Sequence, residues 1–581
     1  MSGAAEVRTT CPYCGVGCGL IAQTRGGRLE SVRGDPIHPV NRGRVCSKPL
    51  ALPVASRSPD RAGVPLRRAS REERWRESSW EELIPWLAGR LREVRERHGP
   101  DALAFYISGQ LLTEDYYVVN KLAKGFLGTN NVDSNSRLCM SSAVSGYRGS
   151  LGSDGPPPAY ADIARADCFL LLGTNTAACH PIVWARIRDR QAEGATVIVV
   201  DPRRTETAAA ADLHLAVRPG ADLALLCSML LVIEREDLAD RAYLARHTEG
   251  YEEALRVAAE WPPERAAEVC GVPGHAIVEA ARRFAGAGAA MALWSMGANQ
   301  SSVGTLKNQA LINLCLVAGQ IGRPGAGPLS LTGQPNAMGG REVGGLAHLL
   351  PGYRSVAAAA DREEMERLWG LPAGAISPRP GLVATDLFDA LERGEVRVVW
   401  ICATNPVVSM PDAARARRAL MRAELVVCQD AYHPTETSAL ADVVLPAAQW
   451  PEKEGTMTNS ERRVTLLRKA IEPPGAALPD WEIFARLGRA LGFAGQFAYS
   501  DAAQVYDEYR ACTAGRLCDQ TGIDHERLRR DGSVQWPCPA RDPALGEHTG
   551  SERLYADHRY PTPSGRARVV PTPHAEPAEP P

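Results

Sequence analysis

Short apolar runs that lead into glycine, asparagine or aspartate recur along the chain and predict the buried strands of parallel sheets. The runs are residues 102–107, 168–172, 197–200, 398–402 and 425–428. Between them lie stretches with the spacing of amphipathic helices, such as Tyr116 to Leu127 and Asp480 to Leu491. Strands that alternate with helices are typical of α/β proteins with doubly wound sheets.

Two distant parts of the chain repeat the same order of strand, turn and acidic residue. The first copy contains Asn175, Asp201, Thr205 and Asp212. The second contains Asn405, Asp430, Thr435 and Asp442 at nearly the same spacing. In a doubly wound sheet, turn amides hold phosphates, and a carboxylate at the next strand end accepts hydrogen bonds from ribose or a base. The repeat therefore predicts two nucleotide-bearing ligands on two related domains, although either copy alone also fits an ordinary strand-end turn.

Length and charge limit the kinds of partner that the chain can have. A chain of 581 residues exceeds one hydrophobic core, so we expect three or more folded units. Lys and Arg number 66 against 68 Asp and Glu, which leaves no basic surplus for nucleic acid or an anionic membrane. The longest apolar stretches, such as Ala224 to Ile233, are too short to cross a bilayer. The first ten residues lack an apolar signal segment, so we expect a cytoplasmic protein.

Four cysteines near the start of the chain form its strongest single motif. Cys11, Cys14, Cys18 and Cys46 follow the pattern C-x2-C-x3-C-x27-C. Four thiolates suit a [4Fe-4S] cluster or a structural zinc ion, and three close cysteines with one distant one favour the cluster. Lys48 must lie near this site; it is either a solvated surface lysine or a charge that bridges the cluster to a second redox centre.

A single cysteine marks the polar segment from Asp133 to Val144. Cys139 stands where a short helix is predicted to begin. Helix-start amides and the helix dipole should lower its thiol pKa and leave a thiolate, which makes Cys139 a candidate metal ligand. The alternative is a small buried apolar residue.

Glycine is dense in three segments between the two copies: residues 294–300, 319–325 and 331–345. So many glycines in long loops imply close approach of the backbone to a large ligand. Within them, Arg341 could bind a planar oxyanion bidentately or form a structural salt bridge. The loop 454–463 could wrap the phosphates of a cofactor. The proline-rich tail from Pro561 is expected to be disordered.

On these motifs the chain resembles the molybdopterin oxidoreductases that bind molybdenum bis(molybdopterin guanine dinucleotide), and within them the catalytic subunits of assimilatory nitrate reductases. The resemblance runs from Cys11 to about Arg568 and is most specific in three stretches: Cys11 to Cys18 with Cys46, Asn135 to Val144, and Leu331 to Leu346. It implies a [4Fe-4S] cluster on the four cysteines, molybdenum on Cys139 and Lys48 between cluster and pterin. It also places Met140, Asp154 and Arg341 near the substrate channel.

The resemblance also implies a fold and a set of cofactor contacts. The fold would be α/β, with a small N-terminal Fe-S domain and two related Rossmann-like doubly wound domains around a central cofactor crevice. Its expected domains are 1–57 for the cluster, 58–135 with 345–490 for one dinucleotide, 136–344 for the other, and 491–581 as an extension. Cofactor-binding residues would be Asn175, Asp201, Thr205, Asp212, Gly220, Asp222, Met296, Gly297, Gln334, Met338, Asn405, Asp430, Thr435, Asp442, Asn459 and Arg462.

The activity implied by the resemblance is reduction of nitrate to nitrite by oxygen-atom transfer, with electrons entering through the cluster. No flavin or nicotinamide motif is present, so we expect a donor such as ferredoxin, flavodoxin or a separate NAD(P)H-dependent reductase subunit. Two alternatives are a formate dehydrogenase of the same fold, in whose branch a histidine replaces Met140, and a non-catalytic electron-transfer subunit. Family members usually continue past Pro563 to Arg568 into a β-barrel domain, which we expect this chain to lack.

Overall fold

The computed structural model describes residues 5–540, 546 and 548–578, which divide into two compact units. Unit 1 runs to Arg137 and also contains Gln334–Asn459 and Arg463–Gly550. Unit 2 contains Leu138–Gly333, Ser460–Arg462 and the segment that starts at Ser551. Each unit is built on its own mainly parallel sheet.

Unit 1 contains a seven-stranded sheet in the order β5-β4-β18-β17-β16-β6-β7. Its strands are β4 (Leu66–Arg67), β5 (Arg76–Glu77), β6 (Leu103–Ile107), β7 (Val132–Ser134), β16 (Val398–Cys402), β17 (Leu425–Asp430) and β18 (Val443–Pro446). The five strands from β18 to β7 are parallel, and the short β4 and β5 add an antiparallel edge. The central strands are buried along their whole length, as expected for a sheet covered on both faces.

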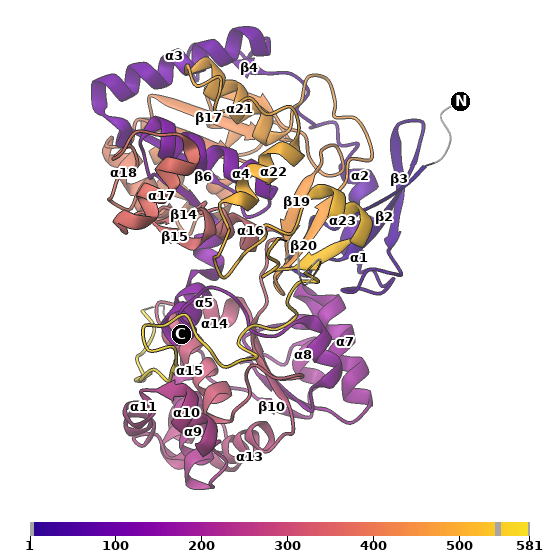
Figure 1. Cartoon of the computed structure of the whole chain (residues 1–581), viewed down its shortest axis with the longest axis vertical. Coiled ribbons are helices and arrows are strands. Elements are labelled where there is room, and N and C mark those ends of the chain that lie inside the picture. Colours follow the sequence, from indigo (N-terminus) through magenta and orange to yellow (C-terminus); the bar gives the residue numbers. More distant parts are fainter. Residues whose placement is uncertain (1–4, 541–545, 547, 579–581) are drawn as a thin grey trace. The chain divides into compact units, whose positions relative to one another are not determined.

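Neighbouring residues of β6 show how helices cover both faces of this sheet. The ring of Phe105 lies 6.3 Å from that of Phe484 on α21 (Asp480–Ala490). The ring of Tyr106 lies 5.2 Å from that of Phe388 on α18 (Ala384–Arg393). Successive side chains of a strand point to opposite faces, so α21 and α18 lie on opposite sides. Helix α3 (Trp80–His98) packs against α21 (Figure 1). Helix α20 (Ala413–Arg422) packs against α18.

Unit 2 contains a five-stranded parallel sheet in the order β10-β9-β8-β12-β13. Its strands are β8 (Cys168–Leu172), β9 (Thr196–Val200), β10 (Leu213–Leu215), β12 (Ala290–Trp294) and β13 (Gly327–Ser330). Its helices include α5 (Ser136–Leu151), α6 (Thr176–Cys179), α7 (Pro181–Ala192), α8 (Glu206–Ala209), α9 (Asp222–Arg235), α13 (Gly274–Ala285), α14 (Met296–Asn299) and α15 (Gly304–Val317). Strands that alternate with helices confirm the α/β fold predicted from the sequence.

The two parallel sheets have the same strand order. Strands β8, β9 and β10 correspond to β16, β17 and β18, and the first strand of each set is continued by two more parallel strands. The residue after that first strand has a left-handed backbone in both units: Gly173 with φ +57° and Ala403 with φ +53°. The repeat seen in the sequence therefore continues into the sheet topology and into one backbone angle.

A small antiparallel sheet carries the N-terminal cysteines in unit 1. It consists of β1 (Ala5–Thr10), β2 (Gly19–Arg25) and β3 (Arg28–Gly34). The short helices α1 (Ser47–Leu50) and α2 (Leu52–Ala55) follow and pack against β3. A further three-stranded sheet of unit 1 contains β19 (Gly455–Thr458), β20 (Arg463–Leu467) and β21 (Ser533–Gln535).

Two helices show how local contacts and backbone geometry set their extent. In the charged stretch before Pro100, α3 begins at Trp80, because the Ser79 side chain accepts a hydrogen bond from the Glu82 N–H and caps the helix. Trp75 lies outside it, with the Arg68 guanidinium 4.3 Å from its ring. The predicted helix 116–127 consists of α4 (Thr113–Asn120) followed by a π-helical segment, Lys121–Leu127.

The expectation of a disordered proline-rich tail is wrong for the described residues through Ala578. Strand β22 (Ala567–Arg568) pairs in parallel with β11 (Thr248–Glu249) in unit 2. Beyond it, the Val570 N–H donates to Asn313 Oδ1 at 3.0 Å. Proline lacks an N–H, but the residues between the prolines supply enough donors to anchor an extended chain. In the described part of the chain, no helix is both long and apolar enough for a bilayer.

Candidate functional site

The first three cysteines lie on the loop that joins β1 to β2. The Cys11 N–H donates to the Cys18 carbonyl at 2.9 Å, which closes this loop. Cys46 occupies the N-cap position of α1, beyond β3. Cys11 and Cys18 are buried, whereas Cys14 and Cys46 are half-buried. The fold therefore gathers all four predicted ligands in one module and keeps two of them near solvent.

The four thiols are close enough to influence one another. Burial raises the pKa of the Cys11 thiol, Cys14 and Cys46 raise that pKa further, and Lys48 opposes them. Burial also raises the pKa of Cys18, with added contributions from the other three thiols. Buried thiols of this kind ionise readily only when cationic metal replaces their protons. The donor set therefore fits a metal centre that binds thiolates.

Two kinds of centre bind four thiolates. A zinc site holds four sulfur atoms at about 2.3 Å from one ion. A [4Fe-4S] cluster is larger and takes one thiolate at each iron.

Cys139 lies in the first turn of α5, as predicted, and is 7% exposed. Its Sγ atom is 3.2 Å from Met296 Sδ on α14. A Cβ atom added to Gly333 would lie 3.6 Å from the same Sγ. Residues from two of the predicted glycine-dense segments therefore approach Cys139 directly.

Met140, the next residue, is held by a side chain that the sequence analysis did not identify. Asn299 Nδ2 donates to Met140 Sδ at 3.4 Å, and Ser142 Oγ donates to the Asn299 carbonyl at 2.8 Å. Asn299 Oδ1 is buried and accepts no hydrogen bond from any described residue. A buried acceptor without a protein donor is costly, so this atom indicates a polar ligand beside Met140.

Arg341 lies on α16 (Ala337–Glu342) in unit 1 and is 4% exposed. Its guanidinium donates to the Ala337 carbonyl at 3.1 Å and to Met338 Sδ at 3.3 Å. Burial raises the pKa of the adjacent Glu342 to about 7, against the effect of Arg341. A buried guanidinium can bind a planar oxyanion through two parallel hydrogen bonds, so the predicted role of Arg341 in anion binding stays a prediction.

The glycine-dense run after Arg341 is fixed by a buried lysine. Lys124 Nζ donates to the carbonyls of Gly344, Leu346 and Leu349 at 2.8, 2.7 and 2.5 Å. Burial lowers the pKa of Lys124 to about 7. The run therefore has a defined backbone, although its sequence alone suggests a mobile loop.

The duplicated strand-end turns use matching hydrogen bonds in the two units. Asn175 Oδ1 accepts from Thr207 Oγ1 at 2.9 Å, and Asn405 Oδ1 accepts from Thr437 Oγ1 at 2.6 Å. In each unit the threonine hydroxyl also accepts a backbone N–H from the helix that follows the asparagine. The two turns are therefore the same structure, built twice.

The paired acidic residues of these turns have different environments. Asp201 and Asp430, at the strand ends, each accept a backbone N–H from two residues further on, at 2.9 and 3.1 Å. Asp212 and Asp442 instead bind the second residues of β9 and β17, accepting N–H groups at 2.8 Å in both units. Asp442 is also ion-paired with Arg71 at 2.8 Å. The two acidic residues of each turn therefore bind different parts of the backbone.

Comparison with known proteins identifies the family. The sequence profile described as molybdopterin oxidoreductase matches residues 61–490, and that of the molybdopterin oxidoreductase Fe4S4 domain matches residues 4–52. The chain belongs to the molybdopterin oxidoreductase family. Enzymes with both domains carry a molybdenum–pterin cofactor and a [4Fe-4S] cluster.

Relatives within the molybdopterin oxidoreductases align over nearly the whole chain. A nitrate reductase of Synechocystis is 49% identical over 96% of this chain and 79% of its own length. A nitrate reductase of Klebsiella oxytoca is 42% identical over 97% of this chain and 64% of its own length. An F420-dependent formate dehydrogenase subunit alpha of Methanocaldococcus jannaschii is 36% identical over 99% of this chain and 81% of its own.

A solved molybdopterin-family structure has the same fold. Acetylene hydratase from Pelobacter acetylenicus matches with a TM-score of 0.78 and 23% identity, covering 97% of this chain and 77% of that chain. At this identity the likeness concerns the fold alone. The α/β architecture with an N-terminal Fe-S domain is thus confirmed.

The residues of each unit fit the cofactors of a molybdopterin oxidoreductase. Four clustered thiols suit the [4Fe-4S] centre. In unit 1, Gln334 Oε1 is a second buried acceptor with no donor among the described residues. Asn299 Oδ1 is such an acceptor in unit 2, and each of the two atoms offers a polar contact to a ligand within its own unit. The cofactor would supply the redox chemistry, and these residues would hold it.

Other predicted cofactor residues already have partners within their own unit. In unit 2, Asp222 is ion-paired with Lys307 at 2.8 Å, and Arg462 donates to the carbonyls of Pro156, Ser551 and Glu552. Asp154 is buried there, and Gly220 has φ +87°.

In unit 1, Asn459 Nδ2 donates to the Val16 carbonyl, inside the cysteine loop, at 3.0 Å. Thr205 and Thr435 each accept a backbone N–H three residues on. Their cofactor roles stay predictions.

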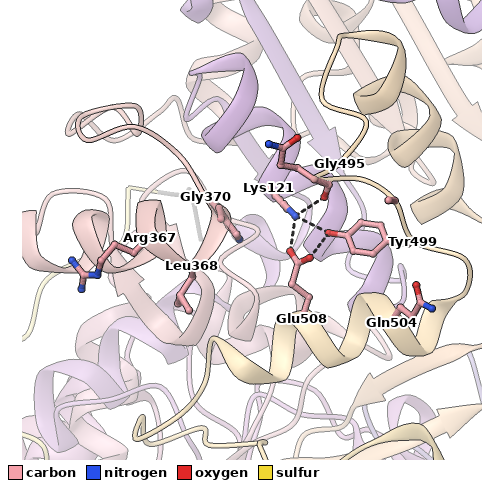
Figure 2. Close-up of a pocket in the computed structure, with 11 residues that line it drawn as sticks. Lys121, Arg367, Leu368, Gly370, Gly495, Tyr499, Gln504 and Glu508 are labelled. Carbon is pink, nitrogen blue, oxygen red and sulfur yellow. Dashed lines mark hydrogen bonds and ion pairs between the residues drawn. The ribbon is translucent and has the colours of Figure 1, made fainter.

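A pocket of about 490 Å³ in unit 1 lies among residues that carry none of the predicted roles. Lys121 lines this pocket, and Figure 2 shows it pointing toward Tyr499 and Glu508. Lys121 Nζ donates to Glu508 at 2.6 Å, to Tyr499 at 2.8 Å and to the Gln496 carbonyl at 2.7 Å. Since these groups neutralise one another, the pocket receives no catalytic assignment.

Proposed function

We propose that this enzyme reduces nitrate to nitrite. The observation that carries the proposal is Met140 directly after Cys139, with its sulfur 3.4 Å from Asn299 Nδ2. In the formate dehydrogenase branch that the sequence resembles less, a histidine takes this place. The names of the relatives also favour nitrate as the substrate. Relatives named nitrate reductase reach 49% identity to this chain, and those named formate dehydrogenase reach 36%.

The reaction consumes two electrons and two protons for each nitrate and releases nitrite and water. When bound, the molybdenum–pterin cofactor supplies the oxygen-atom transfer, and the cluster supplies one-electron entry. Cys139 holds the metal through its thiolate, beside Met296. Arg341 binds the nitrate anion through its planar guanidinium, which matches two oxygens of a planar oxyanion.

Lys48 has a positioning role between the two redox centres. It lies in α1, two residues after Cys46, and its charge acts on Cys11. A cation close to the thiolates stabilises the extra negative charge of a reduced cluster. Lys48 therefore raises the cluster potential and favours its reduction by the donor.

The two repeated turns hold the two dinucleotide arms of the cofactor. Unit 2 contributes Asn175 and Asp201, and unit 1 contributes Asn405 and Asp430. Burial raises the pKa of Asp430 to about 6, and backbone N–H groups oppose this. A carboxylate of this kind accepts hydrogen bonds from a guanine amino group or from ribose.

We assign the enzyme to nitrate assimilation in the cytoplasm, with a separate one-electron carrier as donor. The chain has fifteen cysteines, and an odd number would leave one unpaired in the disulfide framework of an exported protein. A relative named periplasmic nitrate reductase, from Desulfovibrio desulfuricans, is 42% identical over 97% of this chain. Fractionation of the native host would test the assignment, because enzyme found in the periplasm would contradict it.

The test is metal analysis and turnover of the protein purified without oxygen. We expect about one molybdenum and four irons per chain, and nitrite formation from nitrate with reduced methyl viologen. The same preparation is given formate with oxidised viologen. If formate reduces the viologen and no nitrite forms from nitrate, the enzyme is a formate dehydrogenase and our proposal is wrong. If the protein contains iron but no molybdenum and has no turnover, it is a non-catalytic electron-transfer subunit.

A further inference from the structure

The cluster module differs in charge from the rest of the chain. Residues 5–57 contain eight arginine and lysine side chains against three acidic ones, a formal charge of +5. The whole chain has a formal charge of −2, so the remainder carries −7. Each of the three acids, Glu6, Glu30 and Asp35, is ion-paired with an arginine of the module. The excess of positive charge is therefore confined to this module.

The same module exposes an unusual share of large apolar side chains. Among the described residues, seven such side chains are exposed, and three of them lie between positions 37 and 54. They are Ile37, Leu50 and Val54, which are 68%, 53% and 71% exposed. Exposed apolar side chains close to a basic rim are typical of the centre of a protein interface.

Leu50 and Val54 lie close along the chain to the predicted cluster ligand Cys46. Cys46 caps α1, and Leu50 is its last residue, four positions further on. At a helical rise of about 1.5 Å per residue, Leu50 stands roughly 6 Å along the axis from Cys46. Val54 follows on α2, and the exposed Arg57 binds the Pro53 carbonyl through Nε at 2.8 Å. A protein docked on α1 and α2 would therefore sit close to the cluster.

We propose that the exposed side of α1 and α2, together with Ile37, Arg42, Arg44 and Arg57, docks a small acidic [2Fe-2S] carrier protein. This inference rests on the proposed function, because it supplies the electrons that nitrate reduction needs. Each encounter oxidises one reduced carrier by one electron, so two carriers serve one nitrate. A second copy of this chain is disfavoured, since two +5 modules repel each other.

The charge and size of this surface suit a transient complex. Electron-transfer partners bury little area and dissociate quickly. Charges at the rim speed the encounter, while the apolar centre gives the docked pair its stability. Carrier binding is therefore expected to weaken steeply with added salt.

The test measures binding of oxidised plant-type ferredoxin to the complete chain by calorimetry, beside two activity assays. The variants are Val54→Asp and Arg57→Glu. Matched controls are Val408→Asp, at a side chain 62% exposed, and Arg417→Glu on α20. We expect both test variants to weaken ferredoxin binding by about tenfold or more, while the controls bind as the parent does. Nitrite formation driven by ferredoxin should fall equally, and that driven by reduced methyl viologen should not change.

The outcomes separate this inference from the function on which it rests. Unchanged ferredoxin binding in Val54→Asp and Arg57→Glu overturns the docking surface, and so does self-association through this face. Binding of flavodoxin in place of ferredoxin overturns the proposed [2Fe-2S] partner. Absence of nitrite with methyl viologen in the parent protein overturns the proposed function instead. In that event the binding measurement still decides whether the surface exists.

Discussion

The Sγ atom of Cys139 and the Sδ atom of Met296 lie 3.2 Å apart, so a thiol at a helix start faces a thioether from a glycine-dense segment. Both sulfur atoms can bind a soft metal, and only the cysteine can do so as an anion.

Replacing Cys139 by Ser should therefore remove molybdenum-dependent activity. We expect nitrite formation to fall by at least about 100-fold and the molybdenum content to drop, with iron retained. Cys315→Ser, at a fully buried cysteine of α15 in the same unit, is the matched control and should keep its molybdenum. Full activity in Cys139→Ser would remove this residue from the metal site.

Arg341→Lys tests recognition of the anion. Lysine keeps the positive charge but loses the planar pair of donors, so we expect kcat/KM for nitrate to fall by about 100-fold, mainly through KM. Arg354→Lys, at a buried arginine that pairs with Glu364, should lower stability without changing KM. Equal KM values for Arg341→Lys and the parent enzyme would contradict the assignment.

Cys46→Ser tests the cluster. Loss of one of four thiolates should reduce iron to well below four per chain and abolish the charge-transfer absorption of the cluster. Cys179→Ser, at an exposed cysteine of unit 2, should leave both unchanged. Retention of the full iron content in Cys46→Ser would exclude the proposed ligand set.

Ala403 holds the left-handed backbone that its counterpart Gly173 adopts without strain. Ala403→Gly should therefore stabilise unit 1 by about 0.5–1 kcal/mol. Gly173→Ala should do the reverse in unit 2, because its Cβ would lie 2.8 Å from the Ala298 nitrogen. Apparent unfolding midpoints in urea decide this, and a lower midpoint for Ala403→Gly would contradict it.

His525 gives unit 1 a stability that depends on pH. Burial lowers its pKa, but Glu114 Oε1 at 2.8 Å from Nε2 and Glu454 Oε1 at 3.7 Å from Nδ1 raise it to about 9. Arg529 also pairs with Glu454. Since the folded pKa exceeds the ordinary 6.5, the contribution is complete below pH 6.5 and disappears as pH rises through 9.

We expect His525→Gln to lower the free energy of unfolding by up to about 3 kcal/mol at pH 6 and by little at pH 10. His275→Gln, at an exposed histidine, is the control. An equal loss at both pH values would show that His525 acts through packing and not through its charge.

Strands β6, β8, β9, β16 and β17 were predictable because each contains a continuous apolar run. The repeat was predictable because Asn175 and Asn405 stand at the same offset from such runs. Helix ends depend on single caps, which is why α3 starts at Trp80 and not earlier. The path of the tail depends on distant partners such as Asn313, which no local pattern reveals.

Within the candidate site, the spacing of the cysteines was sufficient to group them. By contrast, Asn299 and Lys124 escaped notice, because their importance comes from atoms contributed by other segments, Met140 Sδ and the carbonyls after Arg341. Unlike Asn299 and Lys124, Glu342 could have been noticed in the sequence, because it is an acidic residue directly after Arg341 inside a glycine-dense run.

The division of the chain into two units has a consequence for its biosynthesis. The polypeptide passes from one unit to the other five times. One of the segments in unit 2 consists of only three residues, Ser460–Arg462. Neither unit can therefore be produced by cutting the gene at two points, and limited proteolysis cannot release one intact. Unit 1 extends to Gly550, so a ribosome must pass that residue before the unit can close. Insertion of a cofactor into unit 1 must then follow the synthesis of that residue.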